Sequence, residues 1–309
     1  MERLLRLCLR ITVPGSLMKK LFQMRCLPYY GLLIVYATTL LSGCAGKSYS
    51  SPPGYDFRKP AVSELGKSLN EISGITYNSE DGSLWAVSDS KRKIISIELK
   101  KQKLKDETGS IVAEDQDLED LVKLDNEAFL LSSKGLIYEV PLSTMDSASV
   151  RPHQFWSTEK NDFETLYYDA SADGLIMLCK TCESDKGKHI RSAYRFNLKT
   201  KQFDSSALFT ISTEEIRKML KNDDAEFDPS AAAIHPLNKR LYILSSAGNL
   251  LVVTDNRGRV MEAYNLNPDK NPQAEGIAFA PNGDMYITNE GKYGKPTLQI
   301  FKYHNGKNK

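Results

Sequence analysis

The chain has 309 residues, of which 41% are hydrophobic and 26% charged, and its formal net charge is +2. This composition excludes a disordered acidic or basic tail, a collagen-like repeat and a protein that crosses a membrane many times. The 15 Tyr, 11 Phe, 19 Gly and 13 Pro favour many short strands separated by turns.

The first 43 residues predict an export signal. A basic stretch that starts at Met18 is followed by the apolar run 29–41, YYGLLIVYATTLL. As a helix this run would be about 20 Å long, which is too short for a hydrocarbon core of about 30 Å but typical of a secretory signal. Residues 1–17 are superfluous to such a signal, which leaves Met18 and Met24 as alternative start sites.

Residues 41–44, LSGC, resemble a bacterial lipobox. We therefore expect Cys44 to carry acyl chains such as palmitate and residues 44–55 to form a flexible tether; a signal peptide with a chance Cys is the alternative. Ala45 is not the Asp that retains many lipoproteins in the inner membrane, which favours the outer membrane, facing the periplasm. Residues 1–43 hold six Lys or Arg and one Glu, so the mature chain carries −3, a balance that predicts no nucleic-acid partner.

Five segments then share a strand-turn-strand pattern. It starts at residues 73, 119, 164, 230 and 275, with spacings of 46, 45, 66 and 45 residues. Turn residues such as Asp81 and Gly82 join the two strands. A third strand follows in each unit, and a weaker fourth lies between units, as at 109–112 and 259–263. Four short antiparallel strands every 45 residues or so are typical of a β-propeller blade.

The predicted fold is thus all-β, a propeller of five four-stranded blades over residues 56–309. Six blades are the alternative and would need a degenerate unit; a run of hairpins in a sandwich would not repeat the same register. Residues 55–69 are expected to complete the last blade and close the ring. A capping box at Ser212 and Glu215 predicts a short helical insertion near residues 212–221, over an edge or the channel mouth.

Acidic residues recur where the first strands begin. These strands line the channel of a propeller, so we expect their carboxylates to meet in a ring at one channel mouth. A cation there would offset their repulsion, and oxygen ligands favour Ca²⁺ or Mg²⁺. The alternative is that the acids cap strand ends or form ion pairs between blades. The predicted ring consists of Glu71, Glu119, Asp120, Glu164, Asp228 and Glu275. The candidate metal ligands among them are Glu119, Glu164 and Glu275.

A second predicted ring closes the second strands, and we expect it at the opposite end of the channel. Its members are Asp89, Ser133, Lys180, Ser246 and Glu290.

Cys179 and Cys182 form a CxxC motif at the end of a predicted strand. One pair cannot make a four-thiolate zinc site. In an oxidising periplasm we expect a local disulfide across the turn, with free thiols as the alternative. His189 and His235 are expected to be ordinary surface residues.

Five phrases resemble the SdiA-regulated family of exported bacterial propellers, which is related to phytase-like and strictosidine-synthase-like groups. They are NEISGI at 70–75, DLEDL at 117–121, DFETL at 162–166, DPSAA at 228–232 and AEGIA at 274–278. The resemblance covers roughly residues 60–305 and implies the fold, but no reaction.

Two functions from different classes follow. The first is a membrane-anchored, monomeric binding propeller whose ligand is a small molecule or a protein. The second is a Ca-dependent hydrolase, phosphoesterase-like or lactonase-like, with its site at the channel mouth. An envelope structural protein is a third reading.

Overall fold

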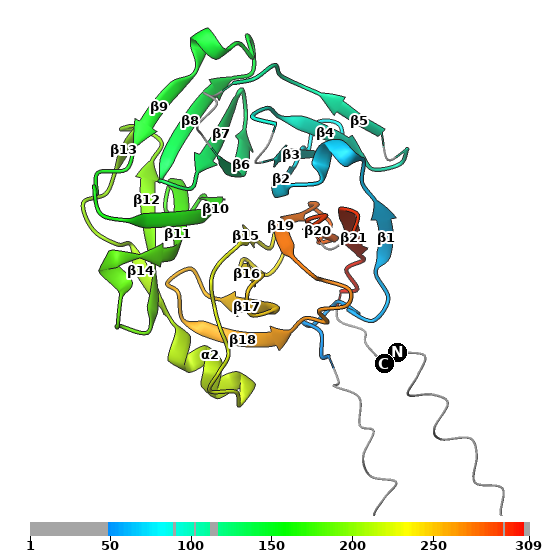
Figure 1. The fold of residues 1–309 in the computed structure, drawn as a ribbon, viewed down its shortest axis with the longest axis vertical. Coiled ribbons are helices and arrows are strands. Elements are labelled where there is room, and N and C mark those ends of the chain that lie inside the picture. The colour runs from blue at the N-terminus through cyan, green and yellow to red at the C-terminus, as the bar shows by residue number, and fades with distance from the viewer. Residues whose placement is uncertain (1–48, 89–90, 102, 112–116, 293, 306–309) are drawn as a thin grey trace, which may run out of the picture. The chain divides into compact units, whose positions relative to one another are not determined.

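Five antiparallel sheets are arranged in a ring around a central axis in this computed structural model (Figure 1). The structure describes residues 49–88, 91–101, 103–111, 117–292 and 294–305. The predicted signal, Cys44 and Asp89 lie outside the described residues. Residues 49–309 form one compact unit. In the described part of the chain, no helix is long and apolar enough to cross a membrane.

Each blade runs outward from an innermost strand beside the channel. Blade 1 contains β2 (Ile72–Tyr77), β3 (Leu84–Ser88), β4 (Ile95–Glu98) and β5 (Lys103–Asp106). Blade 2 contains β6 (Leu118–Leu124), β7 (Glu127–Ser132), β8 (Leu136–Pro141) and β9 (Arg151–Gln154). Blade 3 contains β10 (Asn161–Asp169), β11 (Gly174–Cys182), β12 (Ile190–Asn197), β13 (Gln202–Phe203) and β14 (Phe209–Ser212).

Blade 4 contains β15 (Ala231–Ile234), β16 (Leu241–Ser245), β17 (Leu250–Thr254) and β18 (Val260–Asn265). Blade 5 contains β19 (Ala274–Phe279), β20 (Met285–Asn289), β21 (Thr297–Phe301) and, from the start of the domain, β1 (Ala61–Glu64). Short 3₁₀ helices occupy Lys67–Leu69, Ser147–Ser149 and Glu183–Asp185.

The ring closes through β1. This strand pairs antiparallel with β21, with Ala61 opposite Ile300, so residues from both ends of the domain share blade 5. The five-blade propeller and its closure by the segment 55–69 are confirmed. One strand prediction is wrong: the outer strand of blade 1 is Lys103–Asp106, because these residues and not those from 109 onward pair with β4. Ile111 is buried and donates its amide to the Arg92 carbonyl.

The predicted helix is α2 (Thr213–Leu220). The Ser212 hydroxyl accepts a hydrogen bond from the Glu215 amide at 3.2 Å, which satisfies one of the free amides of the first turn. Ile216 is fully buried, and the helix packs against β18 and β12. The insertion therefore covers the outer edge between blades 3 and 4.

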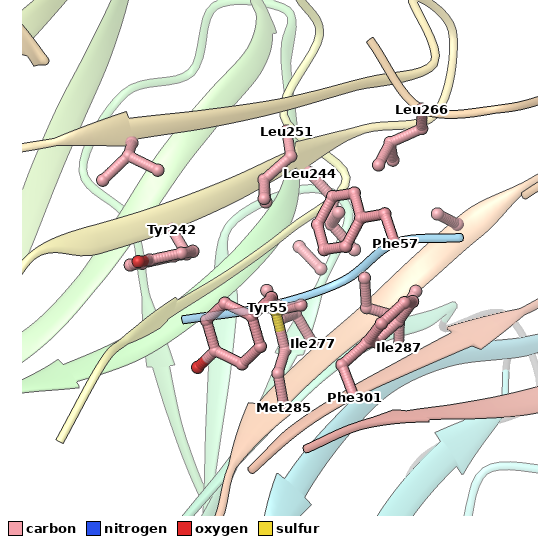
Figure 2. Close-up of a cluster of buried hydrophobic side chains, with 13 residues drawn as sticks. Tyr55, Phe57, Tyr242, Leu244, Leu251, Leu266, Ile277, Met285, Ile287 and Phe301 are labelled. Atoms are coloured by element: carbon pink, nitrogen blue, oxygen red, sulfur yellow. The ribbon is translucent and has the colours of Figure 1, made fainter. Parts of the chain in front are cut away.

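Apolar side chains fill the spaces between neighbouring blades, and the segment before β1 enters one of them (Figure 2). Tyr55 is 2% exposed, and its hydroxyl donates to the Gly283 carbonyl at 2.6 Å. Phe57 packs against Phe301 with ring centroids 4.9 Å apart. The folded unit therefore includes Tyr55, which lies before the predicted boundary at residue 56.

His235 is buried, contrary to the expectation of a surface residue. Its Nδ1 accepts hydrogen bonds from the amides of Leu237 and Asn238, at 3.1 and 3.2 Å. Its ring stacks on Tyr242. Burial, helped by nearby Lys239, lowers the pKa of the imidazole to about 4. The ring is therefore neutral at pH 7 and holds the hairpin turn of blade 4.

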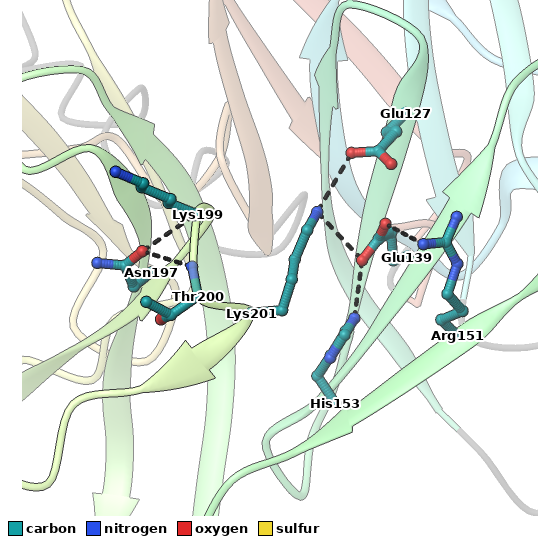
Figure 3. Close-up of polar contacts among 8 residues, drawn as sticks. All are labelled: Glu127, Glu139, Arg151, His153, Asn197, Lys199, Thr200 and Lys201. Atoms are coloured by element: carbon teal, nitrogen blue, oxygen red, sulfur yellow. Dashed lines mark hydrogen bonds and ion pairs between the residues drawn. The ribbon is translucent and has the colours of Figure 1, made fainter.

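A buried carboxylate joins blades 2 and 3 (Figure 3). The Glu139 side chain has no exposed surface, and one of its oxygens lies 2.8 Å from His153 Nε2 and 3.2 Å from Lys201 Nζ. Arg151 approaches the other oxygen at 3.3 Å. Burial alone would raise the pKa of Glu139, but its interactions with Glu127, His153 and Lys201 outweigh burial and hold the pKa below the usual range.

We expect Glu139→Gln to lower the free energy of unfolding by about 1–3 kcal/mol at pH 7, because three cationic or polar partners lose their carboxylate. A depressed pKa stabilises the fold above about pH 4.5 and loses that contribution as the pH falls through the folded-state pKa. Urea denaturation at pH 7 and pH 3 checks this. The loss should be larger at pH 7; an equal loss at both pH values would contradict a charged Glu139.

Candidate functional site

The innermost strands carry bulges close to where they begin. In β6, β10 and β19 the extra residue is Glu119, Glu164 and Glu275, each inserted between two paired residues of its strand. A bulge adds one residue and re-aims its side chain. The alternation along each strand buries the neighbouring side chains between blades. The three glutamates interrupt this alternation, so their side chains point toward the channel.

All five blades contribute to one cavity of about 180 Å³ at this end of the channel. We call it the charged mouth. Its lining consists of Ile72, Ser73, Glu119, Glu164, Ser230, Gln273, Glu275 and Glu290. Three of the predicted first-ring acids are thus brought together.

The members of the second ring that the structure describes lie at this same end, so the prediction of the opposite end is wrong. Glu290 lines the charged mouth beside Glu275. The reason is the antiparallel hairpin: Ala274, at the beginning of β19, pairs with Asn289, at the end of β20. The beginning of a first strand and the end of its second strand must therefore meet.

Lys180 stands beside the charged mouth and contacts one of its glutamates. It is the extra residue of a second bulge, in β11, between Cys179 and Thr181. The two facing bulges of this hairpin each expel one side chain, and the Lys180 ammonium forms an ion pair with Glu164. Within the described ranges, no three His, Cys, Asp or Glu side chains converge to hold a metal ion. The ammonium thus offsets part of the repulsion for which the sequence suggested Ca²⁺.

Two carboxyl groups of the charged mouth have unusual proton affinity. Burial raises the pKa of Glu164, and Asp162 and Asp228 add to this while Lys180 opposes it. Burial also raises the pKa of Glu275, to about 8, and the charge of Glu164 contributes. Glu275 therefore retains its proton at pH 7 and can act as a hydrogen-bond donor there.

Cys179 and Cys182 are joined in a disulfide, with Cα atoms 5.9 Å apart. Both lie within β11 rather than across a turn. Between them stand Lys180 and Thr181. The disulfide therefore encloses the bulge that presents Lys180.

A larger cavity of about 630 Å³ adjoins the charged mouth between blades 3 and 4. We call it the side pocket. Lys180 lies on its wall, together with Lys160, Arg191 and Asp228. The Arg191 guanidinium donates to the Asp228 carboxylate at 2.5 Å and to the Ile190 carbonyl at 2.9 Å. Asp228 therefore belongs to this pocket and not to the channel ring.

Comparison with known proteins identifies the family. The family model described as SdiA-regulated matches residues 52–293. The chain belongs to the SdiA-regulated family. No curated protein matches the sequence.

Solved structures similar to this SdiA-regulated protein are other propeller-like proteins. A calcium-binding protein, regucalcin, from Agrobacterium tumefaciens has 11% identity and a TM-score of 0.50, covering 83% of this chain and 96% of its own. Luciferin-regenerating enzyme has 12% identity and a TM-score of 0.49, covering 80% and 96%. Virginiamycin B lyase from Staphylococcus aureus has 13% identity and a TM-score of 0.43, covering 81% and 90%. At these identities the likeness concerns the fold alone.

Two predicted ring members of the SdiA-regulated protein do not reach either cavity. Asp120 is 3% exposed and accepts hydrogen bonds at 2.8 Å from the amides of Leu121 and Leu166. It ties β6 of blade 2 to β10 of blade 3, so here the structural alternative holds. Glu71 is exposed and lies outside the charged mouth.

Sequence reasoning missed Arg191 and Lys160. Both lie in or beside the long hairpin of blade 3, where the other sequence repeats have no equivalent position. For Arg191 the spacing of 66 residues between the unit starts at 164 and 230 was the available signal, because it marks added structure at this blade.

The other end of the channel is apolar. All five innermost strands line a cavity of about 330 Å³ where they run into their hairpin turns. We call it the apolar mouth. Its lining includes Tyr77, Val122, Tyr168, Ile234 and Phe279, and its one charged member is Lys123.

Proposed function

We propose that this SdiA-regulated propeller is a lipid-anchored protein of the bacterial envelope that binds a ligand with an anionic group in the side pocket. The single observation that supports the binding role is that two cations on the pocket wall each contact a carboxylate: Lys180 pairs with Glu164 of the adjoining charged mouth, and Arg191 pairs with Asp228. The proposal needs no bound metal.

The two cations can exchange their carboxylate partners for an anionic ligand. A ligand carboxylate or phosphate can replace Glu164 or Asp228 as the acceptor for Lys180 and Arg191. Arg191 is about a quarter exposed, with a side-chain accessibility of 23%, so its fork of N–H groups is held in place yet reachable. The volume of about 630 Å³ falls within the range of small-molecule sites.

Binding is tested by thermal unfolding with defined probes: inorganic phosphate, citrate, glutamate and an acidic dipeptide, each at millimolar concentration. We expect at least one probe to raise the Tm by about 2 °C or more, as a ligand that binds only the native state must. Lys180→Met and Arg191→Met should abolish the rise. Lys218→Met is the matched control, since Lys218 pairs with Glu214 on the exposed surface of α2.

A rise that survives both pocket variants would place binding elsewhere and contradict the proposal. The hydrolase alternative makes a different prediction in the same assay. A Tm increase with Ca²⁺ that EDTA reverses would favour that alternative over metal-free binding.

The anchor at Cys44 has its own test. In cells, Cys44→Ser should move the protein from the membrane fraction to the soluble periplasmic fraction, because two or more acyl chains are needed for stable attachment. Mass spectrometry of the N-terminal peptide should show acyl chains on the unaltered protein. Membrane attachment that persists in the Ser variant would contradict the anchor.

A further inference from the structure

The two ends of the channel differ in chemistry. Glutamates line the charged mouth, and Lys180 beside it pairs with one of them, whereas the apolar mouth is lined by apolar and aromatic side chains from all five blades. Lys123, its one charged lining residue, forms an ion pair with Glu80 at 2.6 Å and lies over the Trp85 ring. The apolar mouth therefore presents no unpaired charge in its lining.

The rim of the apolar mouth is exposed. Tyr168, at the end of β10, is 36% exposed, and Leu237, in the turn that follows β15, is 49% exposed. Pro236 and Pro281 stand in the turns beside them. Aromatic and aliphatic side chains at one end of a protein suit the boundary between lipid headgroups and acyl chains, where a Tyr ring can be buried while its hydroxyl stays wet.

The beginning of the folded unit lies at this same end. The Gly54 carbonyl accepts a hydrogen bond from the His304 amide at 2.9 Å, and the Tyr55 hydroxyl donates to the Gly283 carbonyl. Gly283 lies in the turn between β19 and β20, and His304 follows β21, which pairs with the beginning of β20. Both contacts thus hold the chain near the hairpin turns.

The remaining tether is short. Gly54, which is held at the hairpin-turn end, follows Cys44 by ten residues, and ten extended residues span at most about 36 Å. A lipid on Cys44 therefore keeps the hairpin-turn end of the propeller within about that distance of the bilayer.

We infer that the apolar mouth, with Tyr168 and Leu237 at its rim, rests on the lipid bilayer that holds the anchor. This inference rests on the proposed anchor at Cys44. The charged mouth and the side pocket, at the other end, then face the aqueous periplasm, where a polar ligand reaches them.

The test uses the mature lipoprotein reconstituted in phosphatidylethanolamine–phosphatidylglycerol vesicles. Removal of the signal leaves Cys44, which carries the lipid, and the disulfide pair Cys179 and Cys182. An introduced Cys is then the sole free thiol. A fluorophore is attached at Leu237→Cys, and vesicles with lipid-borne quencher are compared with vesicles without it.

Met219→Cys is the matched control, because Met219 is 46% exposed and lies on α2, at the other end of the propeller from Leu237. The helix follows Ser212, the last residue of β14, which pairs with Ile190 at the beginning of β12. We expect the lipid quencher to lower the Leu237 signal at least about two-fold and to leave the Met219 signal nearly unchanged, since quenching acts only within the lipid boundary. Equal quenching at both sites, or stronger quenching at Met219, overturns the orientation.

Two further outcomes also overturn it. If Leu237 is unquenched but becomes shielded as protein concentration rises, a second copy covers the apolar mouth instead of lipid. If the N-terminal peptide lacks acyl chains and the protein does not float with the vesicles, the anchor itself fails. Mass spectrometry on the same sample separates this failure from a wrong orientation.

Discussion

Asp120→Ala is expected to lower the free energy of unfolding by about 3 kcal/mol, the largest effect of any acidic substitution at the channel. The carboxylate accepts two buried amides, from Leu121 and from Leu166 of the next blade, both at 2.8 Å. Alanine leaves both donors without a partner, and each such loss costs about 1–3 kcal/mol. Urea denaturation followed by circular dichroism measures the change.

The Asp120 carboxylate also packs closely against Gly74 of blade 1. A Cβ on Gly74 would lie 2.2 Å from Asp120 Oδ1 and 2.6 Å from its Cα, so only glycine lets the two strands approach. Gly74→Ala should therefore also destabilise the fold, by about 1–3 kcal/mol. Asp117→Ala is the control, because its side chain is exposed and accepts a 3.3 Å hydrogen bond from Ser133. A loss below about 1 kcal/mol in Asp120→Ala would show that water or a shifted backbone satisfies the amides.

The repeat made the fold predictable. Each unit pairs a hydrophobic strand with a turn and a second strand, and the same register recurs, so the number of blades and the closing segment followed from spacing alone. The insertion was also predictable, because the local signal of Ser212 and Glu215 does not depend on distant contacts.

The charged mouth was predictable only in part. Glu119 and Asp120 are neighbours in sequence, yet the first lines the cavity and the second is buried between blades. The bulge at Glu119 causes this difference. The pattern of hydrophobic residues along a strand does not reveal one extra residue. Glu164 and Glu275 owe their position to the same irregularity.

The error about the second ring had a geometric cause. The prediction placed the beginning of a first strand and the end of its second strand at opposite ends of the channel. A hairpin joins the end of the first strand to the beginning of the second, so those two positions lie side by side. The antiparallel register brings Glu290 beside Glu275, and the paired bulges of blade 3 bring Lys180 to Glu164. A cation predicted from charge repulsion is thus supplied, in part, by a residue that the sequence had placed at the other end.

Glu275→Gln is expected to stabilise the protein at neutral and alkaline pH. The folded pKa of Glu275 is about 8, against an ordinary value of 4.5, chiefly because of burial and then because of Glu164. Between these pH values the native state keeps a proton that the unfolded state releases, so the contribution of this group is complete below pH 4.5 and is lost as the pH rises through about 8. Glutamine has no proton to lose.

The free energy of unfolding of Glu275→Gln should therefore exceed that of the unaltered protein by about 2 kcal/mol at pH 8, less than the full shift implies because the side chain is partly exposed. The difference should shrink toward pH 4.5. Urea titrations at several pH values measure it, and subtracting the two curves removes the opposite pH dependence of His235. Glu71→Gln, an exposed change at the same end, should alter stability by less than about 0.5 kcal/mol throughout.

Coupling within the charged mouth gives the sharper comparison. Glu164 raises the pKa of Glu275, so in a Glu164→Gln background the gain from Glu275→Gln should be smaller at pH 8 and should level off at a lower pH, because the remaining carboxyl ionises more easily and its folded-state pKa is lower. If the two substitutions are instead additive at every pH, the carboxyl groups do not sense each other, and water must screen them. The charged mouth would then be an open, hydrated surface rather than an enclosed site in which charges interact strongly.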